Sequence, residues 1–214
     1  MGKNKLKHLN ELGTFSNVYQ LRRDLKGKWN ETVFRNQNPI TLELACGKGE
    51  YTIALARKFP HRNFIGIDIK GARIWRGAKI AIEEKLSNVA FLRTYIDHLT
   101  DYFNPREVEE IWILFPDPYH QKSKARKRLT SSLFLDRYRQ IIKPKGLIHL
   151  KTDDLQLYQF SIEALNEHNA IAHFKTDDLY TSTLPDEILI EKTFYEQKHL
   201  LNSKTIKYIK FTVN

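Results

Sequence analysis

The segment from residue 115 to 128, FPDPYHQKSKARKR, combines one acid with a dense run of bases. Asp117 stands between two prolines and directly follows an apolar run at 111–115 that predicts a buried strand. Five lysine and arginine side chains follow within residues 122–128, and the next acid is Asp136. Open α/β sheets carry their chemistry at the carboxyl ends of strands, and a basic run beside such a turn suits a polyanionic substrate. The segment therefore favours an enzyme that acts on a nucleic acid.

A second candidate site lies in the segment ELACGKGE, residues 43–50, where another apolar run ends. Gly47 and Gly49 allow the backbone to turn sharply and to approach a ligand without a Cβ atom in the way. The third glycine of the dinucleotide fingerprint is absent, and Glu43 places a carboxylate at the end of the strand. An acid here is unsuited to a diphosphate but suits a cationic or hydroxyl-rich ligand such as S-adenosylmethionine. The alternative is an ordinary glycine-rich turn.

Two further residues follow the next two predicted strands. Asp68 lies 19 residues beyond Gly49, a spacing at which a carboxylate accepts hydrogen bonds from both hydroxyls of a ribose. The alternative role for Asp68 is to cap the helix that begins near Ala72. Tyr95 is placed either to border an adenine or to serve as a plain core tyrosine.

Short apolar runs alternate with longer amphipathic ones from residue 40 onward, which predicts βαβ units and a doubly wound, mostly parallel sheet. Residues 170–177 and 205–213 predict an antiparallel pair of edge strands. We interpret residues 1–38 as a basic N-terminal extension and residues 39–214 as the catalytic domain. The parallel strands are predicted at 40–44, 63–69, 89–94, 110–115 and 147–151, and the helices at 51–59, 72–86, 99–103, 131–142 and 155–167.

The net charge of +10 is unevenly distributed along the 214 residues. The first thirty residues contain seven lysines and arginines against two acids, so they form a second basic segment able to contact a phosphate backbone. No apolar run approaches the ~18 residues of a membrane span. The single cysteine, Cys46, leaves no internal disulfide and favours a reducing compartment. We therefore expect a cytoplasmic protein, either a monomer or a homodimer, with no metal and no membrane partner.

Five segments together resemble the bacterial tRNA (guanine-N7-)-methyltransferase family, TrmB. They are ELACGKGEY, FIGIDI, FPDPYHQKSKARKRLT, LKTDD and KTFYEQK, and they occur in order from about residue 40 to 198. The resemblance implies a class I S-adenosylmethionine-dependent methyltransferase fold. It also implies transfer of the methyl group to N7 of guanosine 46 in the variable loop of tRNA.

The resemblance assigns roles residue by residue. It implies that Glu43 and Asp68 hold the methionine and ribose parts of the cofactor at the turn of Gly47 and Gly49, with Tyr95 beside the adenine. Asp117 becomes the central acid of the active site. The tRNA-substrate site then comprises Gln121, Lys122, Asp153, Thr193 and Glu196. The sequence departs from the family at Ala45, at Tyr95, at Tyr119-His120-Gln121 and in the details of the basic run.

The predicted chemistry needs no general base, because guanine N7 carries a lone pair and no proton. The enzyme must align the reacting atoms and exclude water. Methylation leaves positive charge on the purine, so we expect Asp117 to stabilise that charge or to bind the N1–H/N2–H edge. The base must leave its stack, and phosphate contacts from Lys122, Lys124, Arg126, Lys127, Arg128 and the N-terminal segment would offset that cost.

Three other functions are compatible with parts of the sequence. A methyltransferase of small molecules would share the fold but has no use for the basic run. The Asp117-Pro118-Tyr119 turn is similar to the D/N-P-P-Y turn of amino-group methyltransferases, although the second proline is missing. The departures at Tyr95 and Gln121 would also fit a tRNA-binding relative that has lost catalysis.

Overall fold

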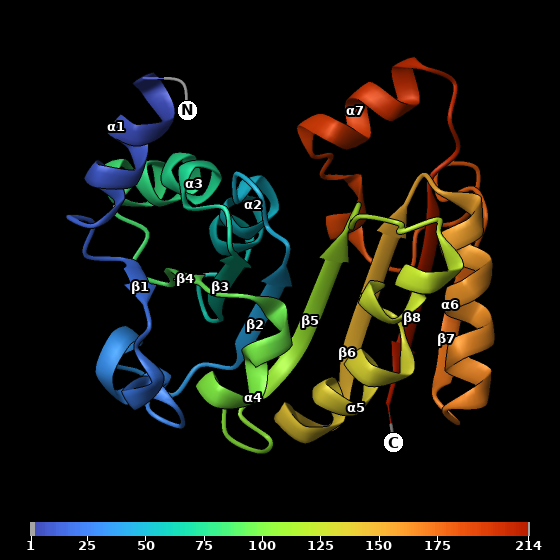
Figure 1. The fold of residues 1–214 in the computed structure, drawn as a ribbon, viewed down its shortest axis with the longest axis horizontal. Coiled ribbons are helices and arrows are strands. Elements are labelled where there is room, and N and C mark those ends of the chain that lie inside the picture. Colours follow the sequence, from blue (N-terminus) through green and yellow to red (C-terminus); the bar gives the residue numbers. More distant parts are fainter. Residues whose placement is uncertain (1–2, 214) are drawn as a thin grey trace.

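The computed structural model of the protein describes residues 3–213, which form one mixed sheet with helices on both faces (Figure 1). The strands are β1 (Val18–Gln20), β2 (Ile40–Leu44), β3 (Asn63–Asp68), β4 (Val89–Arg93), β5 (Val108–Leu114), β6 (Ile142–Thr152), β7 (Ile171–Thr176) and β8 (Lys207–Thr212). The α-helices are α1 (Lys3–Leu12), α2 (Glu50–Lys58), α3 (Gly71–Glu83), α4 (Leu99–Tyr102), α5 (Ser132–Ile141), α6 (Leu155–Glu167) and α7 (Phe194–Leu201). Shorter helical turns are η1 (Arg23–Leu25), η2 (Trp29–Phe34), η3 (Ile96–His98), η4 (Lys122–Lys127) and η5 (Glu187–Ile190).

The sheet has eight strands in the order β1-β4-β3-β2-β5-β6-β8-β7. Neighbouring strands are parallel except that β8 runs antiparallel to both β6 and β7. From β2 the chain builds outward through β3 and β4 on one side, and through β5 and β6 on the other. The strand order therefore reverses between β2 and β5, where sheets of this kind bind their ligands. The predicted doubly wound fold with an antiparallel element is confirmed.

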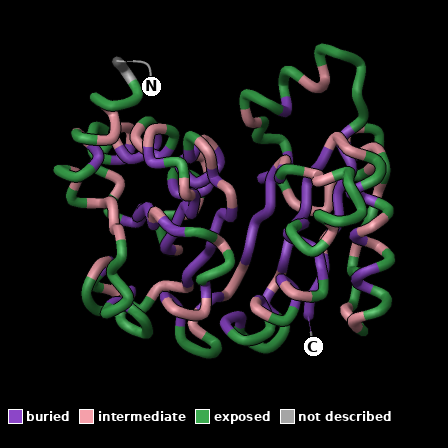
Figure 2. The backbone as a smooth tube through the Cα atoms, viewed as in Figure 1, coloured by how far each residue is buried: buried purple, intermediate pink, exposed green. Residues whose placement is uncertain are grey.

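Alternating side chains of the central strands pack into two separate cores, which explains why β2 and β3 are buried along their whole length and β4 and β5 along most of theirs. Ile65 and Ile67 of β3 enter one core together with Leu135 of α5. Phe64 of the same strand enters the other core together with Ile53 of α2. Figure 2 shows these strands as the buried centre of the molecule, between partly exposed helices.

Residues 3–38 pack against the rest of the fold although their sequence has only weak apolar periodicity. The His8 ring stacks on Trp75 of α3 with ring centroids 3.8 Å apart. Strand β1 adds to the sheet by pairing in parallel with β4. Trp29 is fully buried, and its indole N–H donates to the carbonyl of Tyr102 at 2.9 Å. The boundary between residues 38 and 39 stays a prediction.

Two sequence predictions about strands are corrected. Both C-terminal strands were expected at the edge, but β8 lies inside the sheet between β6 and β7. Its side chains are almost all buried, whereas β7 is largely exposed and forms the edge. Ile142, predicted to end a helix, instead begins β6, which includes residues 143–146 ahead of the predicted strand and has a register shift against β5.

Candidate active site

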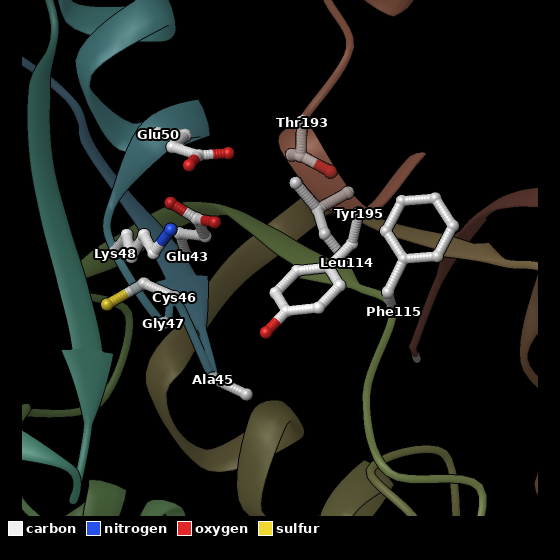
Figure 3. A pocket seen from close by; sticks show the side chains of 10 residues that line it. All are labelled: Glu43, Ala45, Cys46, Gly47, Lys48, Glu50, Leu114, Phe115, Thr193 and Tyr195. Carbon is white, nitrogen blue, oxygen red and sulfur yellow. The ribbon is translucent and has the colours of Figure 1, made fainter. Parts of the chain in front are cut away.

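A cleft of about 480 Å³ lies at the carboxyl ends of β3, β4 and β5. Asp68, Tyr95 and Asp117 all line it, so the structure brings three of the predicted site residues together. A smaller pocket of about 80 Å³ adjoins it through Ala45, which lines both. Figure 3 shows this smaller pocket, with Glu43 and Glu50 on one side and Thr193 and Tyr195 on the other.

The glycine turn after β2 uses left-handed backbone at three alternate positions. Ala45, Gly47 and Gly49 have φ values of 56°, 56° and 69°. A Cβ atom on Gly49 would lie 2.5 Å from the ring of Phe91, so glycine is required there by packing. A Cβ atom on Gly47 would instead meet nothing nearer than the Ala45 carbonyl at 4.0 Å. Gly47 therefore leaves open space beside the turn, as a bound ligand requires.

Asp68 is buried at the end of β3 and holds the turn in place. One carboxylate oxygen accepts from the backbone N–H of Gly47 at 3.0 Å, and the other accepts from the N–H of Lys70 at 2.8 Å. The N-cap residue of α3 is Lys70, and its side chain makes no capping hydrogen bond. The alternative role of Asp68 as the N-cap of this helix is therefore wrong. Asp68 still lines the cleft and keeps acceptor lone pairs for a ligand.

Glu43 is buried at the end of β2 and faces the first turn of α2. It accepts from the backbone N–H of Thr52 at 2.7 Å and from the Thr52 hydroxyl. Burial raises the pKa of Glu43 to about 8, although the hydrogen bonds from Thr52 favour the ionised form. The carboxyl group of Glu43 is thus poised to ionise when a cation arrives.

Tyr95, at the end of β4, is 60% exposed and lies at an edge-on angle to His98. The alternative of a core tyrosine is therefore wrong. Tyr95 lines the large cleft, as Asp68 does.

Asp117 is exposed at the tip of a tightly held turn after β5. Phe115 and Tyr119, two residues before and after it, adopt left-handed conformations with φ of 48° and 43°. Such backbone costs about 1–3 kcal/mol per residue and persists only where its surroundings impose it. At the far end of the turn, His120 Nε2 lies 2.6 Å from a carboxylate oxygen of Asp154, the residue that caps α6. Burial alone would raise the pKa of Asp154, but the bonds from His120 and the Leu157 N–H outweigh it and lower that pKa.

The side chains of the basic run, residues 122–128, do not all point toward solvent. Lys122, Lys124, Arg126 and Lys127 are exposed on η4, and Gln121 is exposed directly before it. Arg128 is only 5% exposed and turns inward. Its predicted role as a phosphate contact is wrong, because the chain leaves η4 at this residue and directs its side chain beneath the Asp117 turn.

The remaining predicted substrate residues gather on and beside α7. Asp153 pairs with Lys204 at 2.5 Å and with His199 at 3.2 Å. Thr193 begins α7 and accepts from the N–H of Glu196 at 3.2 Å, while the Glu196 carboxylate accepts from the N–H of Thr193. Glu196 itself is fully buried in an ion pair with Lys151 at 2.6 Å and accepts from the Tyr180 hydroxyl at 2.5 Å. Its carboxylate thus points into the protein and away from the clefts.

Helix α7 was not predicted, although its start carries the capping-box pattern of Thr193 and Glu196 three residues apart. The helix lies beyond the carboxyl ends of β5 and β6 (Figure 1). Glu50 of α2 accepts from the backbone N–H of Phe194 at 2.7 Å and so fixes α7 beside the smaller pocket. Tyr195, a further residue missed in the sequence, lines that pocket.

A doubly wound sheet with an acid at the end of β3, a glycine turn after β2 and a cleft at the strand reversal defines a class I S-adenosylmethionine-dependent methyltransferase. Solved structures share this fold. The 16S rRNA methyltransferase KamB aligns over 86% of this chain and 92% of its own, with a TM-score of 0.62 and 15% identity. The 16S rRNA (adenine(1408)-N(1))-methyltransferase of Catenulisporales acidiphilia covers 90% and 94%, with a TM-score of 0.62 and 13% identity.

Sequence comparisons narrow the class to one family. The family model described as "Putative methyltransferase" matches residues 37–209. A tRNA (guanine-N(7)-)-methyltransferase of Christiangramia forsetii is 47% identical over 99% of this chain and 98% of its own length. The enzyme of the same name from Bacteroides fragilis is 46% identical over 99% and 86%, and that from Bacillus subtilis is 37% identical over 82% and 80%. The chain therefore belongs to the bacterial tRNA (guanine-N7-)-methyltransferase family.

Among the described residues, no helix is long and apolar enough to cross a membrane, and no three His, Cys, Asp or Glu side chains group as metal ligands.

Proposed function

We propose that this protein transfers a methyl group from S-adenosylmethionine to N7 of guanosine 46 in the variable loop of tRNA. The names of its relatives support tRNA and guanine N7 as the target. The observation that carries the proposal is the shared cleft of Asp68, Tyr95 and Asp117, which joins a nucleoside site to an exposed acid.

The residues around the glycine turn fit the cofactor. S-adenosylmethionine, when bound, supplies an electrophilic methyl group on a sulfonium. The open space at Gly47 admits a ligand close to the backbone, and the buried Asp68 offers acceptors to two ribose hydroxyls. Glu43, whose pKa is raised to about 8 by burial, would face the ammonium group of the cofactor, and a cation at that place would favour the ionised carboxylate. Tyr95 borders the adenine end of the large cleft.

Asp117 acts on the guanine. No proton has to be removed from N7, so its carboxylate does not serve as a general base. It stabilises the positive charge that develops on the purine, or accepts from the N1–H and N2–H groups of the base. An interaction that strengthens as charge develops lowers the barrier more than it strengthens ground-state binding.

The exposed side chains around the site are the ones we propose to contact the tRNA. Gln121 and Lys122 lie just beyond the Asp117 turn and are open to the base and its phosphate. Lys124, Arg126 and Lys127 continue the same exposed surface. Thr193 lines the smaller pocket, and Asp153 lies beside α7 in its pairs with His199 and Lys204. Glu196, being buried, contributes by holding α7 and Thr193 in place.

The decisive experiment is incubation of the protein with unmodified tRNA and methyl-labelled cofactor, followed by mapping of the labelled nucleoside. Label at N7 of guanosine 46 is the expected result. Label on an exocyclic amino group would establish the amino-group methyltransferase instead. A protein that binds tRNA but shows no cofactor binding in calorimetry would be the catalytically impaired relative.

Replacing Asp117 by alanine tests the central role. We expect methyl transfer to fall on the order of 10²-fold or more, with tRNA affinity retained within a few-fold. Single-turnover rates and tRNA-binding titrations measure the two effects separately. Asp136→Ala, the same substitution on the exposed face of α5 outside the cleft, is the matched control. Full activity in Asp117→Ala would remove Asp117 from the mechanism.

A further inference from the structure

Arg128 ends the basic run but differs from its neighbours in its exposure and in its contacts. Arg126 and Lys127 are exposed, whereas Arg128 is 5% exposed, and its guanidinium lies 4.3 Å from the centre of the Phe160 ring. A cation withdrawn from water in this way is stabilised only where its N–H groups find acceptors. Arg128 therefore has a function inside the protein.

The acceptors of Arg128 are backbone carbonyls of the Asp117 turn. Its Nε donates to the carbonyl of Pro118 at 3.0 Å and to that of Tyr119 at 3.3 Å. Its Nη2 donates to the same Tyr119 carbonyl at 3.0 Å. Pro118 directly follows Asp117, so the guanidinium holds the backbone of the two residues that come after the acid.

The turn needs such support because its backbone is strained. Phe115 and Tyr119, on either side of Asp117, both have positive φ, a conformation that non-glycine residues keep only when their surroundings impose it. The β5 hydrogen bond from the Phe115 N–H to the carbonyl of Lys151, at 2.8 Å, fixes one end of the turn. The contact between His120 and Asp154 fixes the other end. Arg128 engages the middle of the turn, at the two carbonyls directly after the acid.

Arginine is suited to this role and lysine is not. A guanidinium presents several donors in a rigid plane, which allows one side chain to hold two carbonyls while its flat face packs on an aromatic ring. A lysine ammonium reaching the same place has neither the planar fork nor the stacking surface. The site is therefore specific for arginine on geometric grounds.

We propose that Arg128 is a positioning residue that holds Asp117 in its productive orientation and takes no part in tRNA binding. The proposal rests on the proposed function, in which Asp117 acts on the purine. On this proposal, the exposed residues of the basic run contact phosphates, whereas the buried Arg128 shapes the active site.

The test compares Arg128→Gln with Arg126→Gln, two identical substitutions two residues apart. For Arg128→Gln we expect kcat to fall about 10- to 100-fold, as for a small misplacement of a catalytic group. The tRNA Kd and the slope of log Kd against log salt should match those of the unaltered protein. For Arg126→Gln the loss should lie in tRNA affinity, with the salt slope reduced by about one.

Two measurements keep the result interpretable. Hydrogen exchange at residues 117–121 should accelerate in Arg128→Gln and not in Arg126→Gln, a readout that needs no activity. If Arg128→Gln does not fold, Arg128→Lys keeps the charge and should still lose kcat. Unaltered kcat in Arg128→Lys, or a salt slope reduced by about one in Arg128→Gln, would overturn the proposal. Absence of tRNA methylation by the unaltered protein would instead overturn the proposed function.

Discussion

Ala45, one of the positions where the sequence departs from the family, occupies a backbone conformation that favours glycine. With φ of 56° its Cβ approaches the following carbonyl, a contact that costs an L-residue about 1–2 kcal/mol. Ala45 also lines both pockets. The protein tolerates alanine here because the side chain is small, but a glycine at this position should make the folded state more stable.

Ala45→Gly should therefore stabilise the protein by about 0.5–1 kcal/mol, since relief of the strain exceeds the added freedom of the unfolded chain. Cofactor affinity should not fall, because the change only widens the pockets. Chemical denaturation gives the free energy of unfolding. Ala54→Gly, inside α2, is the matched control and should destabilise by about 1 kcal/mol. Equal destabilisation by both variants would show that the φ at Ala45 carries no strain.

Residue types predicted the site better than they predicted the direction of each side chain. Asp68, Tyr95 and Asp117 follow strands whose apolar runs are legible in the sequence, so their meeting at one sheet edge could be inferred. Arg128 and Glu196 could not be placed in the same way. Both belong to charged segments, and only the path of η4 and the docking of α7 bury them.

At the scale of elements, a buried ion pair is one of the contacts that hold α7 on the catalytic domain. Glu196 on α7 and Lys151 on β6 are both fully buried, and the Tyr180 hydroxyl donates to the same carboxylate. Burial lowers the pKa of Lys151, although the neighbouring Glu196 opposes that shift. The helix that carries Thr193 and Tyr195 therefore depends on a pair that is costly to break.

Glu196→Gln should destabilise the protein by about 3 kcal/mol or more, because it leaves the Lys151 ammonium buried without its counter-charge. Adding Lys151→Met should recover most of that loss, since the glutamine can still accept from Tyr180. Denaturation of the two single variants and the double variant forms the cycle that measures the coupling. A Glu196→Gln protein that is as stable as the original but inactive would instead point to direct contact with the substrate.

The sequence indicates where α7 begins, but it does not indicate where the helix packs on the rest of the protein. The capping box at Thr193 and Glu196 predicts a helix start, yet the short polar segment has no apolar stripe that would dock it. Its contacts include the buried ion pair, the bond from the Phe194 N–H to Glu50, and the pairing of His199 with Asp153. These join residues more than 40 positions apart, which local patterns do not reveal.

At the scale of the whole molecule, the positive charge is divided between surfaces with different uses. Arg22 and Arg23 pair with Asp24 and Asp101, and Lys26 donates to the carbonyl of Thr100 at 2.6 Å. Part of the basic N-terminal segment thus serves intramolecular contacts. The exposed cations of η4 are the ones beside the Asp117 turn.

Replacing Lys124, Arg126 and Lys127 together by glutamine should weaken tRNA binding and reduce its salt slope by about two to three, since each lost phosphate contact releases one counterion fewer. The matched control replaces Lys85, Arg106 and Lys145 by glutamine; these residues are exposed near the amino-terminal ends of β4, β5 and β6 and carry the same total charge. Binding titrations from about 50 to 200 mM salt measure both slopes. The control should keep the original slope, because its cations lie away from the cleft. Equal reductions in the two triple variants would mean that tRNA responds to net charge alone, and an unchanged slope in the η4 variant would place the tRNA on another surface.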